Sequence, residues 1–205
     1  MTQRIRECFN VNVGQLENIV EMDETYIGGK SRNRHHSKYE KGTQGRSTKY
    51  KTPVLGMIER GGNLIAKVVP NTKSKTLIPE ILKNVKPNTK IMTDEWVAYS
   101  SLNKYKDYIH SYIKHSQKEY VDGEVHTNTI ESVWAILKRG FIGIYHVMSR
   151  KHLQRYVDEF VFRYNTRNYN ENDRFHYFFR NMKNKLKWKD LLGCNCSVLR
   201  KYIIL

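Results

Sequence analysis

The sequence lacks any apolar run that approaches the ~18 residues of a membrane-spanning helix, and its polar start, M-T-Q-R-I-R-E, is not a signal peptide. Cysteine is scarce as well, because the chain has only Cys8, Cys194 and Cys196. The C-N-C pair has no second pair at the spacing of a zinc ribbon. These absences argue against a membrane protein and against a zinc ribbon, and they favour a reducing, intracellular setting.

Acidic residues are few relative to basic ones. The 205 residues include 36 Lys plus Arg and 20 Asp plus Glu, which gives a formal net charge of +16. A surplus of this size predicts a polyanionic partner, and nucleic acid before a membrane. Apolar residues make up only 39% of the chain, but its 14 tyrosines argue against disorder throughout. The length suits one domain with a sizeable core and a small appendage.

Residues 30–51 differ in character from the rest of the chain. The segment has eight Lys or Arg, one Glu and no aliphatic residue, so it cannot contribute to a core. We interpret it as a basic loop that binds phosphates, and a plain linker is the alternative. Its candidate DNA-binding residues are Lys30, Arg32, Arg34, Lys38, Lys41, Arg46 and Lys49.

Local patterns predict the order strand, hairpin, helix, strand, strand and then helices. The ranges are a strand within 20–29, a hairpin over 53–70 that turns at R-G-G-N, a helix over 74–85, strands over 90–96 and 108–114, helices over 128–139 and 149–165, and a helix that begins near Asn172. Pro79 is acceptable only near the first turn of its helix. The helix before residue 90 allows a crossover to a parallel strand. The predicted fold class is α/β, with a mixed sheet flanked by helices.

Three carboxylates in this order could share one edge of the sheet. Asp23 lies within the first predicted strand, Asp94 ends a strand that can lie beside it, and Glu131 opens a helix. Their hard oxygen ligands suit Mg²⁺ or Mn²⁺, and two such ions can promote an in-line phosphodiester displacement. A cation would also explain why a strand tolerates Asp23, since Asp is unfavourable there.

Each of these residues also has a simpler interpretation. Asp23 could begin a turn, with Glu24 as the ligand instead, and Asp94 could end its strand as a turn or cap residue. Glu131 lies three residues after Asn128, so the two could form a variant of a capping box. Lys138 lies two helical turns after Glu131 on nearly the same face, and by itself it would be a solvated lysine.

Five motifs in one order resemble the catalytic domain of ISXO-type bacterial insertion-sequence transposases. They are D-E-T-Y-I-G-G-K at 23–30, G-M-I-E-R-G-G at 56–62, T-D-E-W-x-A-Y at 93–99, V-H-T-N-T-I-E-S-x-W-x-x-L-K-R-G at 125–140 and K-H-L-Q-R-Y-V-D-E-F-x-F-R-Y-N-x-R at 151–167. The similarity runs from about Glu21 to Leu192, which is nearly the whole chain.

The resemblance implies an RNase H-like fold and a DDE active site in which Asp23, Asp94 and Glu131 hold two Mg²⁺ or Mn²⁺ ions. Lys138 matches the basic residue that follows the Glu in many such enzymes, and with Arg139 it is expected to contact DNA. Asn128 belongs to the H-T-N element beside the third acid. An Asn serves at the third position in some relatives, so the roles of Asn128 and Glu131 stay open.

The resemblance also implies an organisation and a setting. We expect a short N-terminal segment over 1–20, a catalytic domain over 21–192 with a basic insertion at 30–51, and a tail over 193–205. Family members usually carry an N-terminal zinc-ribbon or helix-turn-helix region, whereas 22 residues precede Asp23 here. The chain is therefore expected to be a fragment or shortened copy, or to recognise the ends of its element through its basic surface.

The implied activity is DNA cleavage and strand transfer in the bacterial cytoplasm, at the nucleoid, by a homo-oligomer on DNA. The DNA comprises the ends of the element and the target. Two alternatives compete with this activity. One is another RNase H-like nuclease, such as a junction resolvase or an RNase. The other is a DNA-binding remnant of a mobile element without catalysis.

Overall fold

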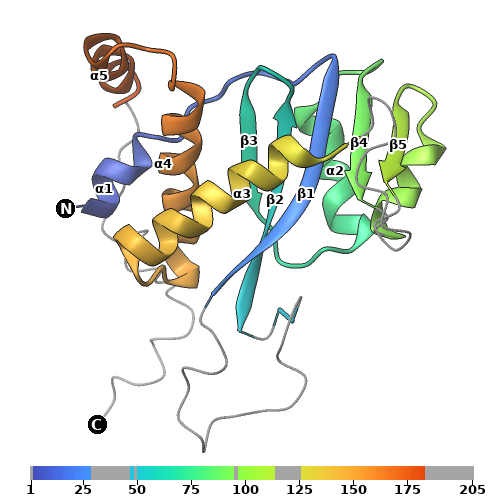
Figure 1. Cartoon of the computed structure of the whole chain (residues 1–205), viewed down its shortest axis with the longest axis horizontal. Coiled ribbons are helices and arrows are strands. Elements are labelled where there is room, and N and C mark those ends of the chain that lie inside the picture. The colour runs from blue at the N-terminus through green and yellow to red at the C-terminus, as the bar shows by residue number, and fades with distance from the viewer. Residues whose placement is uncertain (1, 29–46, 49, 95–96, 114–125, 183–205) are drawn as a thin grey trace, which may run out of the picture. The chain divides into compact units, whose positions relative to one another are not determined.

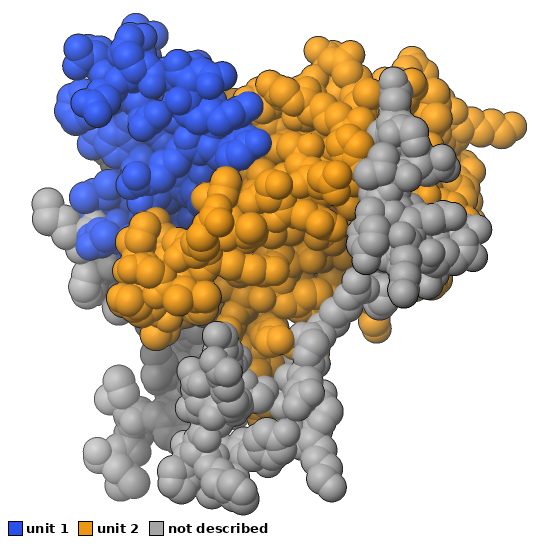
Figure 2. All heavy atoms as spheres, in the orientation of Figure 1, with its two compact units in different colours: residues 1–11, 151–205 blue, residues 12–150 orange. Residues whose placement is uncertain are grey.

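A computed structural model describes residues 2–28, 47–48, 50–94, 97–113 and 126–182 of the chain. The chain divides into two compact units, one of residues 1–11 with 151–205 and one of residues 12–150 (Figure 2). All three predicted acidic residues belong to the second unit. The domain boundaries predicted at residues 20 and 192 stay predictions.

In the described part of the chain, residues 12–150 build a five-stranded mixed sheet of order β3-β2-β1-β4-β5 (Figure 1). The strands are β1 (Ile19–Gly28), β2 (Lys51–Glu59), β3 (Leu64–Val68), β4 (Lys90–Asp94) and β5 (Ile109–Ile113). Strand β2 is antiparallel to both β1 and β3, whereas β4 is parallel to both β1 and β5. The predicted α/β class with a mixed, RNase H-like sheet is confirmed.

One face of the sheet packs against α2 (Ser74–Asn84), which connects β3 to β4. Leu77 and Ile81 of α2 join Val20 and Met22 of β1 in the main hydrophobic core. The helix was predicted with Pro79 near its first turn, but Pro79 lies in the second turn. Proline has no N–H, so α2 lacks the hydrogen bond that this position would donate to the carbonyl of Lys75.

The other face of the sheet is crossed by α3 (Asn128–Gly140), and Figure 1 shows α3 and α2 on opposite sides of the strands. The buried residues of α3 are Ile130, Val133, Trp134 and Leu137, the apolar face that the helical period predicts. Gly56 of β2 leaves room for this helix. A Cβ on Gly56 would lie 2.3 Å from Cζ2 of Trp134 and 2.9 Å from Cδ1 of Ile130. The absence of a side chain at Gly56 therefore sets how closely α3 lies on the sheet.

The hairpin turn agrees with its prediction, since Gly61 has a φ of +73°, a conformation that glycine adopts without strain. Three short elements were not predicted: α1 (Thr2–Glu7), the 3₁₀ helix η3 (Val97–Lys104) and the π-helical turn η5 (Phe141–Tyr145). Each is too short, or departs too far from the α-helical period, to give a clear sequence pattern. Lys51, which we assigned to the basic loop, begins β2.

The smaller unit contains α1, α4 (Leu153–Asn165) and α5 (Glu171–Arg180), and the short 3₁₀ helix η6 (Arg150–His152) precedes α4. Ion pairs join α1 to α4, with 2.9 Å between Arg6 Nε and Glu159 Oε2 and 2.6 Å between Arg155 Nε and Glu7 Oε2. The described part of the chain has no helix that is both long and apolar enough to cross a membrane.

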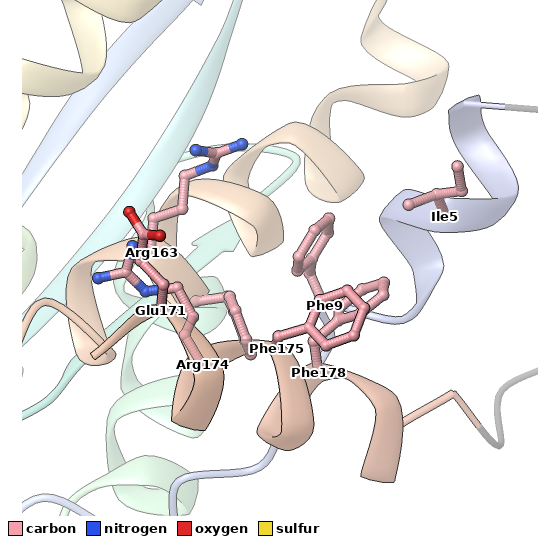
Figure 3. A pocket seen from close by; sticks show the side chains of 8 residues that line it. Ile5, Phe9, Arg163, Glu171, Arg174, Phe175 and Phe178 are labelled. Atoms are coloured by element: carbon pink, nitrogen blue, oxygen red, sulfur yellow. The ribbon is translucent and has the colours of Figure 1, made fainter. Parts of the chain in front are cut away.

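A pocket of about 310 Å³ opens within the smaller unit. Figure 3 shows the rings of Phe9, Phe175 and Phe178 gathered on one side of it, with Arg163, Glu171 and Arg174 on another. Among the described residues, none of the predicted site residues lines this pocket.

The close approach at Gly56 predicts that Gly56→Ala destabilises the larger unit. The added methyl group has to push Trp134 and Ile130 away from the sheet, and overpacking of this kind costs about 1–3 kcal/mol. Urea unfolding measures the change in the free energy of unfolding.

Gly140→Ala is the matched control, because a Cβ at Gly140 meets no atom within 4 Å. That change should stabilise the protein by about 0.5–1 kcal/mol through helix propensity. Equal stability of Gly56→Ala and the wild type would mean that α3 does not lie this close to β2.

Candidate active site

Asp23 and Asp94 lie on neighbouring parallel strands at corresponding positions. The ladder between β1 and β4 pairs Ile19 with Lys90 and ends where Glu21 pairs with Met92. Continuing this register by two residues on each strand brings Asp23 opposite Asp94. The two aspartates therefore occupy corresponding positions on neighbouring strands, each two residues beyond the last paired position, and both are half-buried.

The side chains of the two aspartates point to the face of the sheet that α3 covers. Side chains alternate along a strand, so Asp23 shares a face with Glu21, and Asp94 shares one with Met92. These are the same face of the sheet, because one guanidinium, that of Arg60, contacts both residues. It donates to Oε1 of Glu21 and approaches Sδ of Met92 at 3.2 Å. Asp23 and Asp94 thus lie on adjacent strands and on the same face of the sheet, and a shared metal site remains a prediction.

Glu24, the alternative ligand considered for this strand, lies on the opposite face. Its Oε1 accepts a hydrogen bond from the hydroxyl of Tyr99, a fully buried residue of η3. Burial raises the pKa of Tyr99 well above its ordinary value, and the charges of Glu24, Asp23 and Asp94 raise it further. Tyr99 therefore stays protonated and keeps its proton for the bond to Glu24.

Glu21 holds the start of α3 against the sheet. Its carboxylate is fully buried and accepts hydrogen bonds from the backbone N–H groups of Thr129 and Ile130 at 2.9 and 3.1 Å. The hydroxyl of Thr129 and Nε of Arg60 donate to its Oε1 at 2.9 and 2.7 Å. A carboxylate at a helix N-terminus is favoured both by these donors and by the helix dipole.

Glu131 is exposed in the first turn of α3. The two residues Ile130 and Trp134, which stand before and after it on the helix, both cover Gly56. Gly56 is in turn the β2 partner of Asp23. Glu131 thus lies on the helix that crosses Gly56, the residue next to Asp23 on the neighbouring strand.

The capping box considered for Asn128 and Glu131 is wrong. The residue before the first turn is Thr127, without a side-chain cap, and Asn128 is already inside the helix and exposed. The helix N–H groups that a cap would satisfy are taken by Glu21, from a distant strand. Local spacing could not reveal a partner that is more than a hundred residues away in the sequence.

Residues 15–165 match the family described as the ISXO2-like transposase domain. The chain belongs to the ISXO2-like transposase domain family. The match covers β1 through α4 and includes all three acidic residues.

Two relatives support this membership. An uncharacterized protein in transposable element ISH50 of Halobacterium salinarum is 30% identical over 171 residues, which cover 78% of this chain and 57% of that protein. An uncharacterized transposase-like protein of Haemophilus influenzae is 31% identical over 98 residues, which cover 48% of this chain and 77% of that protein. The transposase domain thus spans little more than half of the length of the first relative.

Solved structures give a weaker similarity. The catalytic core domain of HTLV-2 integrase, in complex with magnesium, aligns with a TM-score of 0.41 and 14% identity over 80% of this chain and 99% of that chain. A simian T-cell lymphotropic virus intasome in complex with PP2A regulatory subunit B56 gamma aligns with a TM-score of 0.39 and 12% identity over 72% of this chain and 50% of that chain.

The donor atoms at Asp23 and Asp94 of the transposase domain suit a hard divalent cation, because both are carboxylates on one face of the sheet. Within the described ranges, no group of three His, Cys, Asp or Glu side chains is close enough to hold a metal ion. The side chain of Glu131 is exposed and has rotatable bonds, so a third ligand requires that it turn toward the pair.

The predicted DNA-binding residues are only partly placed. Lys138 and Arg139 are exposed in the last turns of α3, and Lys138 lies two turns after Glu131 on nearly the same side of the helix. The other predicted cations, Lys30, Arg32, Arg34, Lys38, Lys41, Arg46 and Lys49, lie outside the described residues.

Sequence reasoning did not single out Glu21, Arg60, Gly56 or Tyr99. One signal was available, because Glu21 precedes Asp23 by two residues and so shares its face of the strand. A second charge on a covered face indicates a buried partner. The partner, Arg60, was seen only as part of a glycine turn.

The placement of the two aspartates predicts a metal-dependent rise in thermal stability. Mg²⁺ or Mn²⁺ relieves the repulsion between these carboxylates, and saturation to 100 times the dissociation constant stabilises the folded state by about 2.7 kcal/mol, roughly 5–10 °C in Tm. Differential scanning fluorimetry with and without metal measures the shift.

The Asp23→Asn, Asp94→Asn double variant should lose this metal-dependent shift. Glu24→Gln should keep it, because Glu24 lies on the opposite face of the sheet and contacts Tyr99. A full shift in the double variant would place the metal elsewhere, and loss of the shift in Glu24→Gln alone would make Glu24 the ligand.

Proposed function

We propose that this transposase domain cleaves DNA at the end of an insertion sequence and joins the freed end to target DNA. The single observation that best supports this activity is the pair Asp23 and Asp94. They lie on neighbouring parallel strands at corresponding positions, each two residues past the last paired residue, in an ISXO2-like transposase domain. Glu131 is the third acidic residue of the proposed site, and Asn128 stands beside it on the exposed start of α3.

Two divalent cations at these acids, Mg²⁺ or Mn²⁺, would activate the attacking oxygen and stabilise the leaving oxygen of an in-line displacement at phosphorus. In cleavage, the oxygen of water bonds to phosphorus and the 3′-oxygen of the element leaves and takes up a proton. In strand transfer, this 3′-hydroxyl attacks a target phosphodiester, and the 3′-oxygen of the target leaves. Each displacement breaks one phosphorus–oxygen bond and forms one.

DNA would be held by the basic surface. Lys138 and Arg139 extend from the helix that carries Glu131, and the cations of residues 30–51 follow the strand that carries Asp23. Such cations bind the phosphate backbone without reading bases. We further propose that the domain acts as a homo-oligomer on DNA, because the two ends of an element have to be processed together.

The acid at the third position is tested by comparing Glu131→Gln with Asn128→Ala. Glu131→Gln removes a charge from a site whose contribution is electrostatic, so the rate of strand cleavage should fall on the order of 10²-fold or more with folding intact. The substrate is a DNA duplex that carries the inverted repeat flanking the gene, which is first read from the surrounding genome sequence. Labelled cleavage and joining products are separated on denaturing gels with Mg²⁺ or Mn²⁺ present.

Asn128→Ala is the control on the same turn of α3. Since Glu21 and not Asn128 satisfies the helix N–H groups, this change should leave both stability and cleavage close to those of the wild type. An inactive Asn128→Ala with a near-normal Glu131→Gln would move the third position to Asn128. A wild-type protein that binds the duplex but never cuts it would instead identify a DNA-binding remnant.

A further inference from the structure

The carboxylate of Glu21 has no exposed surface and no lone pair left for a metal. Oε1 accepts from Arg60 Nε and the Thr129 hydroxyl, and Oε2 accepts from the N–H groups of Thr129 and Ile130. In addition, Nδ1 of His126 lies 3.2 Å from Oε1 of Glu21. A carboxylate offers about four acceptor sites. Glu21 is therefore not a ligand, although it is only two residues from Asp23.

The positive charge of Arg60 offsets the charge of Glu21. Nε of Arg60 lies 2.7 Å from Oε1 of Glu21, and the Glu21 side chain is fully buried. An unpaired buried carboxylate would repel the carboxylate of Asp23 through a medium of low dielectric constant. Because Arg60 offsets its charge, Glu21 can hold the start of α3 without adding repulsion to the acidic site.

The hydrogen bonds of this pair end next to each of the three acids. Glu21 itself precedes Asp23 by two residues on the same face of β1. Its bond to the N–H of Ile130 reaches the residue directly before Glu131. Nη2 of Arg60 approaches Sδ of Met92, which precedes Asp94 by two residues, and donates to the carbonyl of His126 at 3.0 Å.

We propose that Glu21, paired with Arg60, is the positioning residue of the acidic site. It fixes the first turn of α3, and thereby the backbone from which the Glu131 side chain extends, relative to the strands that carry Asp23 and Asp94. This inference rests on the proposed function. A residue that orients metal ligands through hydrogen bonds typically affects metal affinity or activity by about 10–100-fold when it is changed.

The test uses Glu21→Gln, which keeps an acceptor oxygen for the helix but loses the charge. Two quantities are measured: the Mn²⁺ concentration that gives half of the metal-dependent thermal shift, and kcat and KM for cleavage of the terminal-repeat duplex. We expect the Mn²⁺ midpoint to rise about 10-fold or more and kcat to fall by a similar factor. KM for DNA should stay unchanged, because Glu21 is buried and contacts no DNA.

A double-variant cycle with Glu131→Gln separates positioning from general stability. If Glu21 acts through Glu131, Glu21→Gln should shift the Mn²⁺ midpoint much less in a Glu131→Gln background than in the wild type. Thr129→Val provides a second route in case Glu21→Gln folds poorly. It removes one hydroxyl donor to Glu21, keeps the ion pair, and should shift the midpoint in the same direction by a smaller factor.

Ile81→Val is the matched control, since Ile81 is fully buried in α2 on the opposite face of the sheet. It should lower Tm without moving the Mn²⁺ midpoint. A wild-type protein that neither binds Mn²⁺ nor cuts DNA would overturn the proposed function and this inference together. An active wild type, with an unshifted midpoint in Glu21→Gln or with independent effects of Glu21 and Glu131, would overturn the positioning role alone.

Discussion

The buried ion pair between Glu21 and Arg60 is the interaction on which the rest of this domain depends. A carboxylate without solvent is costly unless it is paired and fully hydrogen-bonded, and here each lone pair of Glu21 meets a donor. The donors come from the turn after β2 and from the start of α3, while Glu21 lies in the central strand β1. The hydrogen bonds that the buried charge of Glu21 requires thus fix the position of the start of α3 on the sheet.

Packing at Gly56 completes what the ion pair begins. Glu21 holds the start of α3, where Ile130 also covers Gly56 of β2, and Trp134 covers the same glycine one turn further along. The helix is therefore held both by polar contacts at its start and by apolar contacts over Gly56, the β2 partner of Asp23. On the opposite face of the sheet, Glu24 and Tyr99 join β1 to η3, which follows β4 with only residues 95–96 between them. The strand β1, which carries Asp23, is thus bonded to α3 on one face of the sheet and to η3 on the other.

Local patterns were sufficient for most strands and helices, because alternation in β1 and the 3.6-residue period in α3 are set by neighbouring residues. They also predicted that Asp23 and Asp94 lie on adjacent strands. They could not predict that Glu21 replaces a local cap at α3, or that Tyr99 binds Glu24, since both contacts join residues far apart in the sequence. The capping box considered as an alternative for Asn128 and Glu131 is wrong for this reason. The rule that proline is acceptable only near the first turn of a helix did not hold for Pro79, which lies inside α2.

The most direct test of the account is the position of bound Mn²⁺ in crystals of this protein, read from anomalous scattering at the manganese edge. We expect an anomalous peak between the carboxylates of Asp23 and Asp94, with the carboxylate of Glu131 turned toward it and Glu21 still bonded to the start of α3. A peak at Glu24 on the other face of the sheet, or at Glu21 with its helix contacts broken, would contradict it.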